Sequence, residues 1–200
     1  MVPTSGKNIA FKEWSIVCDA LGEGQQTIIF RKGGIHEGKR GFQFTHNEFL
    51  LFPTRFHEQE QKVHLKESTA SKEVPSEYKE GEQVELRYLC KIHSVDIMDQ
   101  WDTIQSLRKF HIWDEPTILE RYRWSKEGEE EPFISLAILR VFELSQSIKL
   151  SYEKKYGGCR SWLKVPEINS AIIDSSQPVI GNNEFKDLIR QINQIIGKSD

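Results

Sequence analysis

The sequence lacks any long apolar run, and this absence limits the class of protein that it encodes. No stretch of about 18 apolar residues occurs, so no membrane-spanning helix is expected. The first residues do not have the charged-then-apolar order of a secretion signal. We therefore expect a cytoplasmic protein that has no contact with a membrane.

Cysteine is also scarce, and the metal-binding residue types show no recognised spacing. Cys18, Cys90 and Cys159 are odd in number and widely separated, which argues against a disulfide framework and against a zinc knuckle. The six histidines form no helical i,i+4 pair and no tight cluster with cysteine. The sequence therefore predicts no metal site, and reduced thiols are expected.

The sequence has no large excess of charge of one sign. Its formal net charge is −3, which gives no overall attraction to nucleic acid or to an anionic membrane. Any contact with a phosphate group therefore needs a local cluster of basic side chains.

What the sequence does contain is enough apolar residues for one compact domain. It has 200 residues, 38% hydrophobic content and five tryptophans, and a chain of this length hides about 70% of its unfolded surface. We expect a single domain over residues 1–200. Residues 58–80 are mostly charged or small and cannot bury enough apolar area to become ordered, so we predict a flexible insertion there.

Strand-like and helix-like patterns alternate along the first part of the chain. Asn8 can cap a short helix that runs to Leu21, because the apolar residues between them roughly keep helical spacing. Apolar strands are predicted at 27–30 and 49–52. Pro53 is expected to end the second strand, since proline cannot donate to a sheet ladder.

The second half of the chain continues this alternation. Long strands are predicted at 84–95 and 133–144, with short helices at 98–107 and after Pro116. Residues 184–196 predict an amphipathic C-terminal helix, because their apolar side chains recur on one side. The pattern indicates a mixed α and β protein.

Basic side chains follow two of the predicted strands. Arg31 and Lys32 come directly after the strand at 27–30 and precede two glycines that allow a tight turn. Arg55 and His57 lie just beyond the next strand. Loops at strand ends often carry binding groups, although basic turns are also ordinary solvated surface.

A second glycine turn, near the carboxyl end, has a similar composition. Gly157 and Gly158 precede Arg160 and Trp162. If these side chains lie near the first turn, together they could hold phosphate by charge and a base by stacking. Otherwise Trp162 is a core residue and the arginines are scattered surface charges. The candidate binding residues are Arg31, Lys32, Arg55, His57, Arg160 and Trp162.

No catalytic motif is complete in the sequence. It has neither a Gly-x-Ser-x-Gly nucleophile turn nor a P-loop. The Glu-x-Lys spacing of metal-dependent nucleases occurs at 77–79 and 184–186, in the insertion and the terminal helix rather than on a strand. The alternative to a binding module is a metal-dependent hydrolase or nuclease that uses His57 with Glu13 and Glu58. The sequence leaves the cofactor and any protein partner open.

Several sequence blocks occur in an order that resembles a known bacterial family. They span about residues 9–165 and read FKEWSIVCDALGEGQQTIIFRKGGI, FLLFPTRFHEQ, FHIWDEPTILERYRW, RVFEL and GCRSW. They resemble the family called domain of unknown function 1802, which carries no assigned activity. The resemblance implies an association with restriction or defence systems.

A second resemblance concerns the architecture. A Gly-Glu-x-Val strand start at 81–84, followed by helices and a long apolar strand, is similar to the PUA-like and ASCH-like RNA-binding domains. This resemblance implies an α+β fold in which a small mixed or barrel-like β-sheet carries peripheral helices. It also implies RNA or DNA as the partner. A nucleic-acid or nucleotide binding module is therefore the function predicted first.

Overall fold

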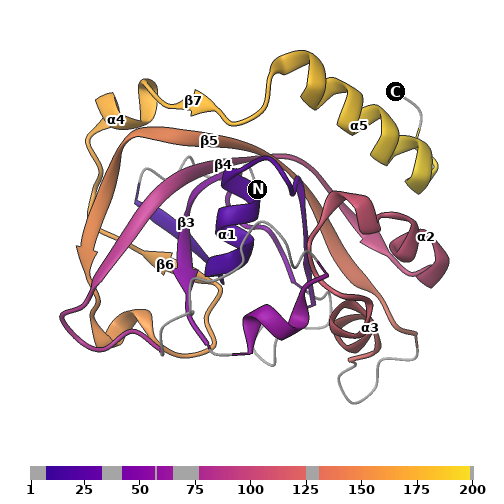
Figure 1. The fold of residues 1–200 in the computed structure, drawn as a ribbon, viewed down its shortest axis with the longest axis horizontal. Coiled ribbons are helices and arrows are strands. Elements are labelled where there is room, and N and C mark those ends of the chain that lie inside the picture. The colour runs from indigo at the N-terminus through magenta and orange to yellow at the C-terminus, as the bar shows by residue number, and fades with distance from the viewer. Residues whose placement is uncertain (1–7, 33–41, 57, 65–76, 125–130, 199–200) are drawn as a thin grey trace.

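A curled β-sheet forms the centre of the molecule (Figure 1). The computed structural model describes residues 8–32, 42–56, 58–64, 77–124 and 131–198. The sheet has seven strands in the order β2-β5-β4-β3-β1-β6, and β7 pairs with β5. The elements are β1 (Ile9–Trp14), α1 (Ser15–Gly22), β2 (Ile28–Arg31), β3 (Glu48–Thr54), the 3-10 turn η1 (Gln59–Lys62), β4 (Gln83–Met98), α2 (Trp101–Ser106), η2 (Arg108–Phe110), α3 (Glu115–Arg123), β5 (Ile134–Ser151), η3 (Lys154–Tyr156), β6 (Trp162–Lys164), α4 (Ser170–Asp174), β7 (Gln177–Pro178) and α5 (Asn182–Ile196).

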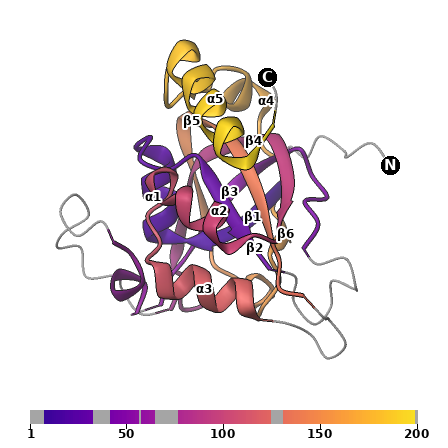
Figure 2. The same cartoon turned by 90° about the vertical axis from the view of Figure 1, so that its right-hand side faces the viewer.

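The sheet is mixed, and helices lie around it. Among the described strands, β1 and β3 are the parallel pair, and the remaining pairs are antiparallel. The helices α2, α3 and α5 lie at the periphery (Figures 1 and 2). This is the α+β fold with a mixed sheet and peripheral helices that the sequence predicted.

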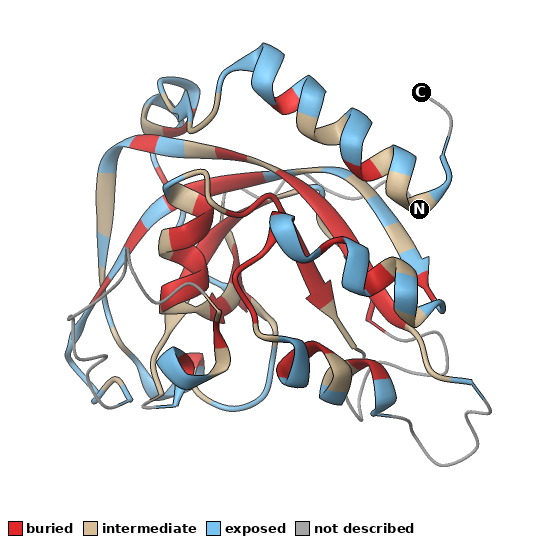
Figure 3. Ribbon diagram, turned by 45° about the vertical axis from the view of Figure 1, so that its right-hand side comes forward, coloured by how far each residue is buried: buried red, intermediate tan, exposed pale blue. Residues whose placement is uncertain are grey.

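Two long strands give the sheet its curl. β4 and β5 pair along almost their whole length, and the register shifts between Leu86 and Tyr88 and again between Ile92 and Ser94. Extra residues on one strand bend the pair and increase its twist. The sheet thereby curves around α1, which lies inside the curl with most of its residues buried (Figure 3).

The end of α1 contacts β4 so closely that only glycine fits. A Cβ atom on Gly22 would lie 1.9 Å from Cζ of Tyr88. Burial raises the pKa of the Tyr88 phenol to about 12. Gly22 therefore allows the helix to pack directly on this ring.

The predicted helix from Asn8 to Leu21 is wrong in its first half. Residues 9–14 form β1, which pairs in parallel with β3 and antiparallel with β6, and α1 begins only at Ser15. Strand formation here depends on partners that are distant in the sequence, and such partners override the local spacing.

The expectation that Pro53 ends its strand is also wrong. β3 continues to Thr54, and Pro53 lies opposite Glu13 of β1. The pairing of β3 with β4 reaches only Leu50. Beyond that residue β3 is paired on one side only, where a proline without an N–H is tolerated.

The predicted insertion at 58–80 begins with residues that belong to the folded unit. Gln59 is fully buried, and its Oε1 accepts hydrogen bonds from the Ser15 hydroxyl at 3.1 Å and the Ile16 amide at 3.4 Å. Its Nε2 donates to the Thr54 carbonyl at 2.7 Å. Val63 forms a β-bridge with Trp113. Residues 65–76 of the predicted insertion lie outside the described residues.

The helix predicted at 184–196 is present as α5, which lies on the outside of the sheet, beyond β5 (Figure 1). Phe185 and Ile192 are its buried residues. Gly197 follows the helix with a φ of 74°, a conformation that glycine adopts without strain. None of the described helices is long and apolar enough to cross a membrane.

Candidate functional site

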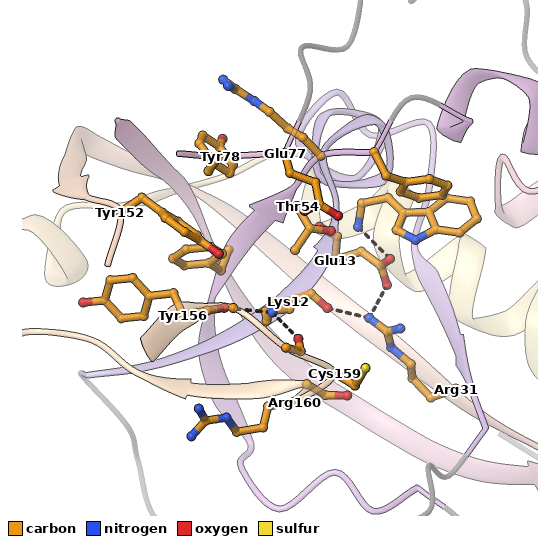
Figure 4. A pocket seen from close by; sticks show the side chains of 17 residues that line it. Lys12, Glu13, Arg31, Thr54, Glu77, Tyr78, Tyr152, Tyr156, Cys159 and Arg160 are labelled. Atoms are coloured by element: carbon orange, nitrogen blue, oxygen red, sulfur yellow. Dashed lines mark hydrogen bonds and ion pairs between the residues drawn. The ribbon is translucent and has the colours of Figure 1, made fainter. Parts of the chain in front are cut away.

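A pocket of about 580 Å³ opens where the ends of β1 and β3 meet the turn between β5 and β6. Figure 4 shows its side chains. Its described lining has four cationic side chains, two carboxylates and a wall of aromatic rings. The lining residues are Lys12, Glu13, Trp14, Arg31, Phe52, Thr54, Arg55, Phe56, Glu77, Tyr78, Tyr152, Tyr156, Gly157, Gly158, Cys159, Arg160 and Ser161.

A buried ion pair forms one side of the pocket. The carboxylate of Glu13 is fully buried and lies 2.8 Å from Arg31, while its other oxygen accepts from the Trp14 amide at 2.8 Å. The Arg31 guanidinium also donates to the Lys12 carbonyl and lies over the ring of Phe11. These contacts hold Arg31 in place and neutralise its charge, so Arg31 shapes the pocket more than it offers charge to a ligand.

Lys12 fixes the glycine turn to the sheet. Its amine donates to the carbonyl of Tyr156 at 2.8 Å and to that of Gly158 at 2.7 Å (Figure 4). Burial lowers the pKa of Lys12, and the nearby Arg160 lowers it further. An ammonium group has three donors, so Lys12 has one left after these two bonds.

Tyrosines form the opposite side of the pocket. Tyr78, Tyr152 and Tyr156 lie together, away from Glu13 and Arg31, with Lys12 between the two groups (Figure 4). The rings of Tyr78 and Tyr152 are stacked, with centroids 5.5 Å apart. Tyr78 and Tyr152 are half-buried, whereas Tyr156 is buried in the core. This wall therefore offers accessible aromatic surface to a flat ligand.

Two arginines at the pocket carry charge that is only weakly compensated. Arg55 lies over Tyr78, with 3.9 Å from its guanidinium carbon to the ring centroid, and reaches Glu82 only at 4.0 Å. Arg160 is exposed and donates to the Lys155 carbonyl at 3.2 Å. Arg55 and Arg160 are the cations best placed to meet an anion from solution.

The structure brings together three of the six residues predicted as a binding site. Arg31, Arg55 and Arg160 line the pocket. Lys32 lies in a different hollow and donates to the Phe133 carbonyl at 2.7 Å. His57 lies outside the described residues.

Trp162 is a packing residue rather than part of the pocket wall. Its ring centroid lies 4.8 Å from that of Phe11 and 5.2 Å from that of Phe49, and it stacks on Phe42. It packs against the main apolar core. The interpretation of Trp162 as a core residue, which the sequence left open, is therefore the one that the packing supports.

Sequence reasoning missed Lys12 and the tyrosine wall. The helix predicted from Asn8 covers Lys12, which in fact lies on β1, so its position at the pocket was hidden. Three of the five tyrosines of the chain line this pocket. The sequence signal that could have indicated this wall is that Tyr152 and Tyr156 lie just before the predicted glycine turn.

The residues of the alternative hydrolase do not assemble in the described structure. Glu13 is occupied by Arg31 and the Trp14 amide. Glu58 is exposed, pairs with Lys62 at 3.9 Å and does not line the pocket. Within the described ranges, no group of three or more His, Cys, Asp or Glu side chains could hold a metal ion.

Fold and site together define a small α+β protein that has a basic pocket with an aromatic wall beside a curled mixed sheet. The chain belongs to the family described as "Domain of unknown function (DUF1802)", whose model matches residues 10–191. This is the family that the sequence blocks resemble. No curated protein matches the chain.

Two solved structures of ASCH from Zymomonas mobilis are similar to the chain. One has 10% sequence identity and a TM-score of 0.47, and the alignment covers 86% of this chain and 96% of that chain. A single-residue mutant of the same protein has 10% identity and a TM-score of 0.48, with coverage of 88% and 100%. ASCH-like domains are also named in the architectural resemblance stated from the sequence.

Proposed function

We propose that the pocket binds a nucleic acid or a nucleotide, with Arg55 and Arg160 on phosphate and the tyrosine wall on a base. One observation carries this proposal. Cations from three distant parts of the chain, at 31, 55 and 160, meet in one hollow that is also lined by Tyr78 and Tyr152. Charge for phosphate and aromatic faces for bases are the two components of single-strand recognition.

The charge distribution supports an anionic ligand. The chain carries a net charge of −3, yet the described lining of the pocket has twice as many cations as carboxylates. One of those carboxylates, Glu13, is already paired with Arg31. The pocket is therefore a local basic site on an acidic protein, and such a site attracts phosphate through short-range contacts.

The stacked tyrosines support a ligand with a flat ring. The Tyr78 ring contacts both the Arg55 guanidinium, 3.9 Å from the ring centroid, and the Tyr152 ring, 5.5 Å away. A base that stacks on the accessible surface of this tyrosine pair would lie near Arg55, which contacts the Tyr78 ring. Arginine guanidinium and aromatic planes are common partners for unstacked bases.

Fluorescence anisotropy at low salt tests this function. The probe is a labelled single-stranded RNA of mixed sequence and about eight nucleotides, with a DNA strand of the same sequence as a second arm. Arg55→Ala and Arg160→Ala are each expected to weaken binding. Each is also expected to lower the dependence of log affinity on log salt by about 0.7 for every phosphate that the variant no longer neutralises.

Arg190→Ala is the matched control, because Arg190 is exposed on α5 and pairs with Asp187 far from the pocket lining. It removes one positive charge without changing the pocket. The proposal is refuted if neither strand nor a free nucleotide binds at low salt, or if Arg190→Ala weakens binding as much as Arg55→Ala.

A further inference from the structure

A second hollow shares the Trp14 side chain with the first pocket. It has a volume of about 290 Å³. Three cations and one carboxylate line it together with two tryptophans. The lining residues are Trp14, Lys32, Lys62, Thr117, Glu120, Arg121 and Trp124.

Arg121 is the central cation of this second hollow. Its guanidinium carbon lies over the rings of Trp14 and Trp113, 4.8 Å from each centroid. Its one hydrogen bond to the described residues goes to the Phe30 carbonyl, at a long 3.5 Å. A guanidinium has five N–H donors, so most of the Arg121 donors have no protein acceptor within the described residues.

The charge of Arg121 is also incompletely balanced. Burial lowers its pKa to about 10 and Arg31 adds to this shift, whereas Glu13 and Glu120 oppose it. Glu13 is the carboxylate that already binds Arg31 at 2.8 Å. Glu13 therefore forms its ion pair with Arg31, and Arg121 has no ion pair within the described residues, so an anion bound at Arg121 would have no carboxylate to displace. Arginine is the side chain best suited to bind phosphate with two parallel donors.

Trp124 supplies the aromatic surface of the hollow. It follows the last residue of α3, and 40% of its surface is exposed. Among the described residues, the exposed large apolar side chains are Val95, Ile97 and Trp124, and only Trp124 is aromatic. An exposed indole beside an arginine offers the same pair of groups as Tyr78 and Arg55 in the first pocket.

We propose that this second hollow is a further nucleotide site, in which Arg121 binds a phosphate and Trp124 stacks on a base. The proposal rests on the proposed function. It specifies the ligand as a single-stranded nucleic acid, rather than a free nucleotide, because only a strand can pass Trp14 and occupy both hollows. Lys32 and Lys62 lie along the second hollow, where they add positive charge beside the strand.

Comparison of two ligands tests this inference. Anisotropy measures a labelled single strand of about eight nucleotides, as RNA and as DNA, and an unlabelled mononucleotide competes for the first pocket. The single strand is expected to bind more tightly than the mononucleotide. Trp124→Ala is expected to weaken binding of the strand roughly ten-fold, the size of one base stack, and to leave the mononucleotide unaffected.

Arg121→Gln is expected to act in the same way, and Arg123→Gln is its matched control. Arg123 lies on the same helix and carries the same charge, but it is exposed and lines neither hollow. Thermal unfolding checks that Arg121→Gln is folded. Trp124→Ala changes an exposed side chain, so it tests the proposal even if Arg121→Gln is unstable.

The outcomes separate this inference from the function on which it rests. The inference is overturned if the unchanged protein binds the strand and the mononucleotide with equal affinity. It is also overturned if Trp124→Ala binds the strand as tightly as Arg123→Gln does. In those cases, if Arg55→Ala lost binding of both ligands, the proposed function of the first pocket would still be supported. If the unchanged protein binds neither ligand, the proposed function fails, and this inference fails with it.

Discussion

Replacement of Glu13 by glutamine tests the buried charges beneath the pocket. The Glu13 carboxylate is fully buried and accepts one hydrogen bond from Arg31 and one from the Trp14 amide, both at 2.8 Å. Glutamine has nearly the same size, but it is neutral and has one acceptor oxygen in place of two. Glu13→Gln therefore removes the counter-charge of Arg31 and leaves one of the two donors without an acceptor.

The expected loss of stability is large. Removing one partner of a buried ion pair costs about 3–5 kcal/mol, because the other charge stays buried and uncompensated. The Arg31 side chain keeps 19% exposure, so water screens part of its charge and we expect about 3 kcal/mol, the lower end of that range. For a chain of this length, that loss lowers Tm by roughly 6–12 °C.

Urea unfolding followed by tryptophan fluorescence measures this change. Glu48→Gln is the matched control, since Glu48 pairs at 2.9 Å with Lys91, whose side chain is 50% exposed. That pair is expected to contribute no more than about 1 kcal/mol. Adding Arg31→Met to Glu13→Gln removes the uncompensated charge, so the double variant should be more stable than the sum of the two single effects indicates. The reasoning fails if Glu13→Gln loses no more than Glu48→Gln, or if the two changes are additive.

The same unfolding assay tests two further features of the core. Gly22→Ala is expected to cost about 1–3 kcal/mol, because its Cβ would overlap the ring of Tyr88. Gly181→Ala, whose Cβ would meet nothing within 4 Å, should be tolerated, and equal losses would contradict this packing. Burial lowers the pKa of His111 from 6.5 to about 3, so between these pH values the unfolded chain binds a proton that the folded chain does not. The free energy of unfolding should therefore fall as the pH drops through this window. His111→Phe should make the free energy of unfolding less dependent on pH there. An unchanged dependence would rule the explanation out.

Elements with strong local signals were predictable from the sequence. The helix after Pro116 is α3, and the side chain of Asp114 caps it by accepting from the Thr117 amide at 2.9 Å. The helix α5 is bounded by Gly181 and Gly197. In both cases the residues that begin or end the helix are its sequence neighbours, so the pattern can be read without knowledge of the fold.

Elements that depend on distant partners were not predictable. β1 has apolar residues at nearly helical spacing, and its strand conformation comes from pairing with β3 and β6. The β3 strand continues beyond Pro53 because its pairing with β4 ends at Leu50, so the missing N–H of the proline interrupts no hydrogen bond to β4. Gln59 falls in the predicted flexible insertion, yet it is buried because its amide bonds the start of α1. Each of these results depends on an interaction that no local window contains.

The site follows the same division. The sequence identified Arg31, Arg55 and Arg160 as candidates because each lies beside a strand end or a glycine turn. Their meeting in one pocket depends on the pairing of β1 with both β3 and β6, which the sequence did not reveal. Trp162 has the composition of a binding residue, but β6 pairs with β1 and places the indole against Phe11. Composition can therefore name candidates, and topology selects among them.

The four cations of the pocket divide into two that hold the structure together and two that are available to a ligand, and substitutions of the two kinds test different things. Arg31 and Lys12 bond to the Glu13 carboxylate or to backbone carbonyls, so they hold β1 and the glycine turn in place. Among the described residues, Arg160 bonds one exposed carbonyl, whereas Arg55 contacts the Tyr78 side chain and reaches a carboxylate only at 4.0 Å. Weaker binding after removal of Arg31 or Lys12 would not separate a missing ligand bond from a deformed pocket. Weaker binding after removal of Arg160, whose one hydrogen bond within the described residues goes to an exposed carbonyl of η3, would report mainly the bond to the ligand.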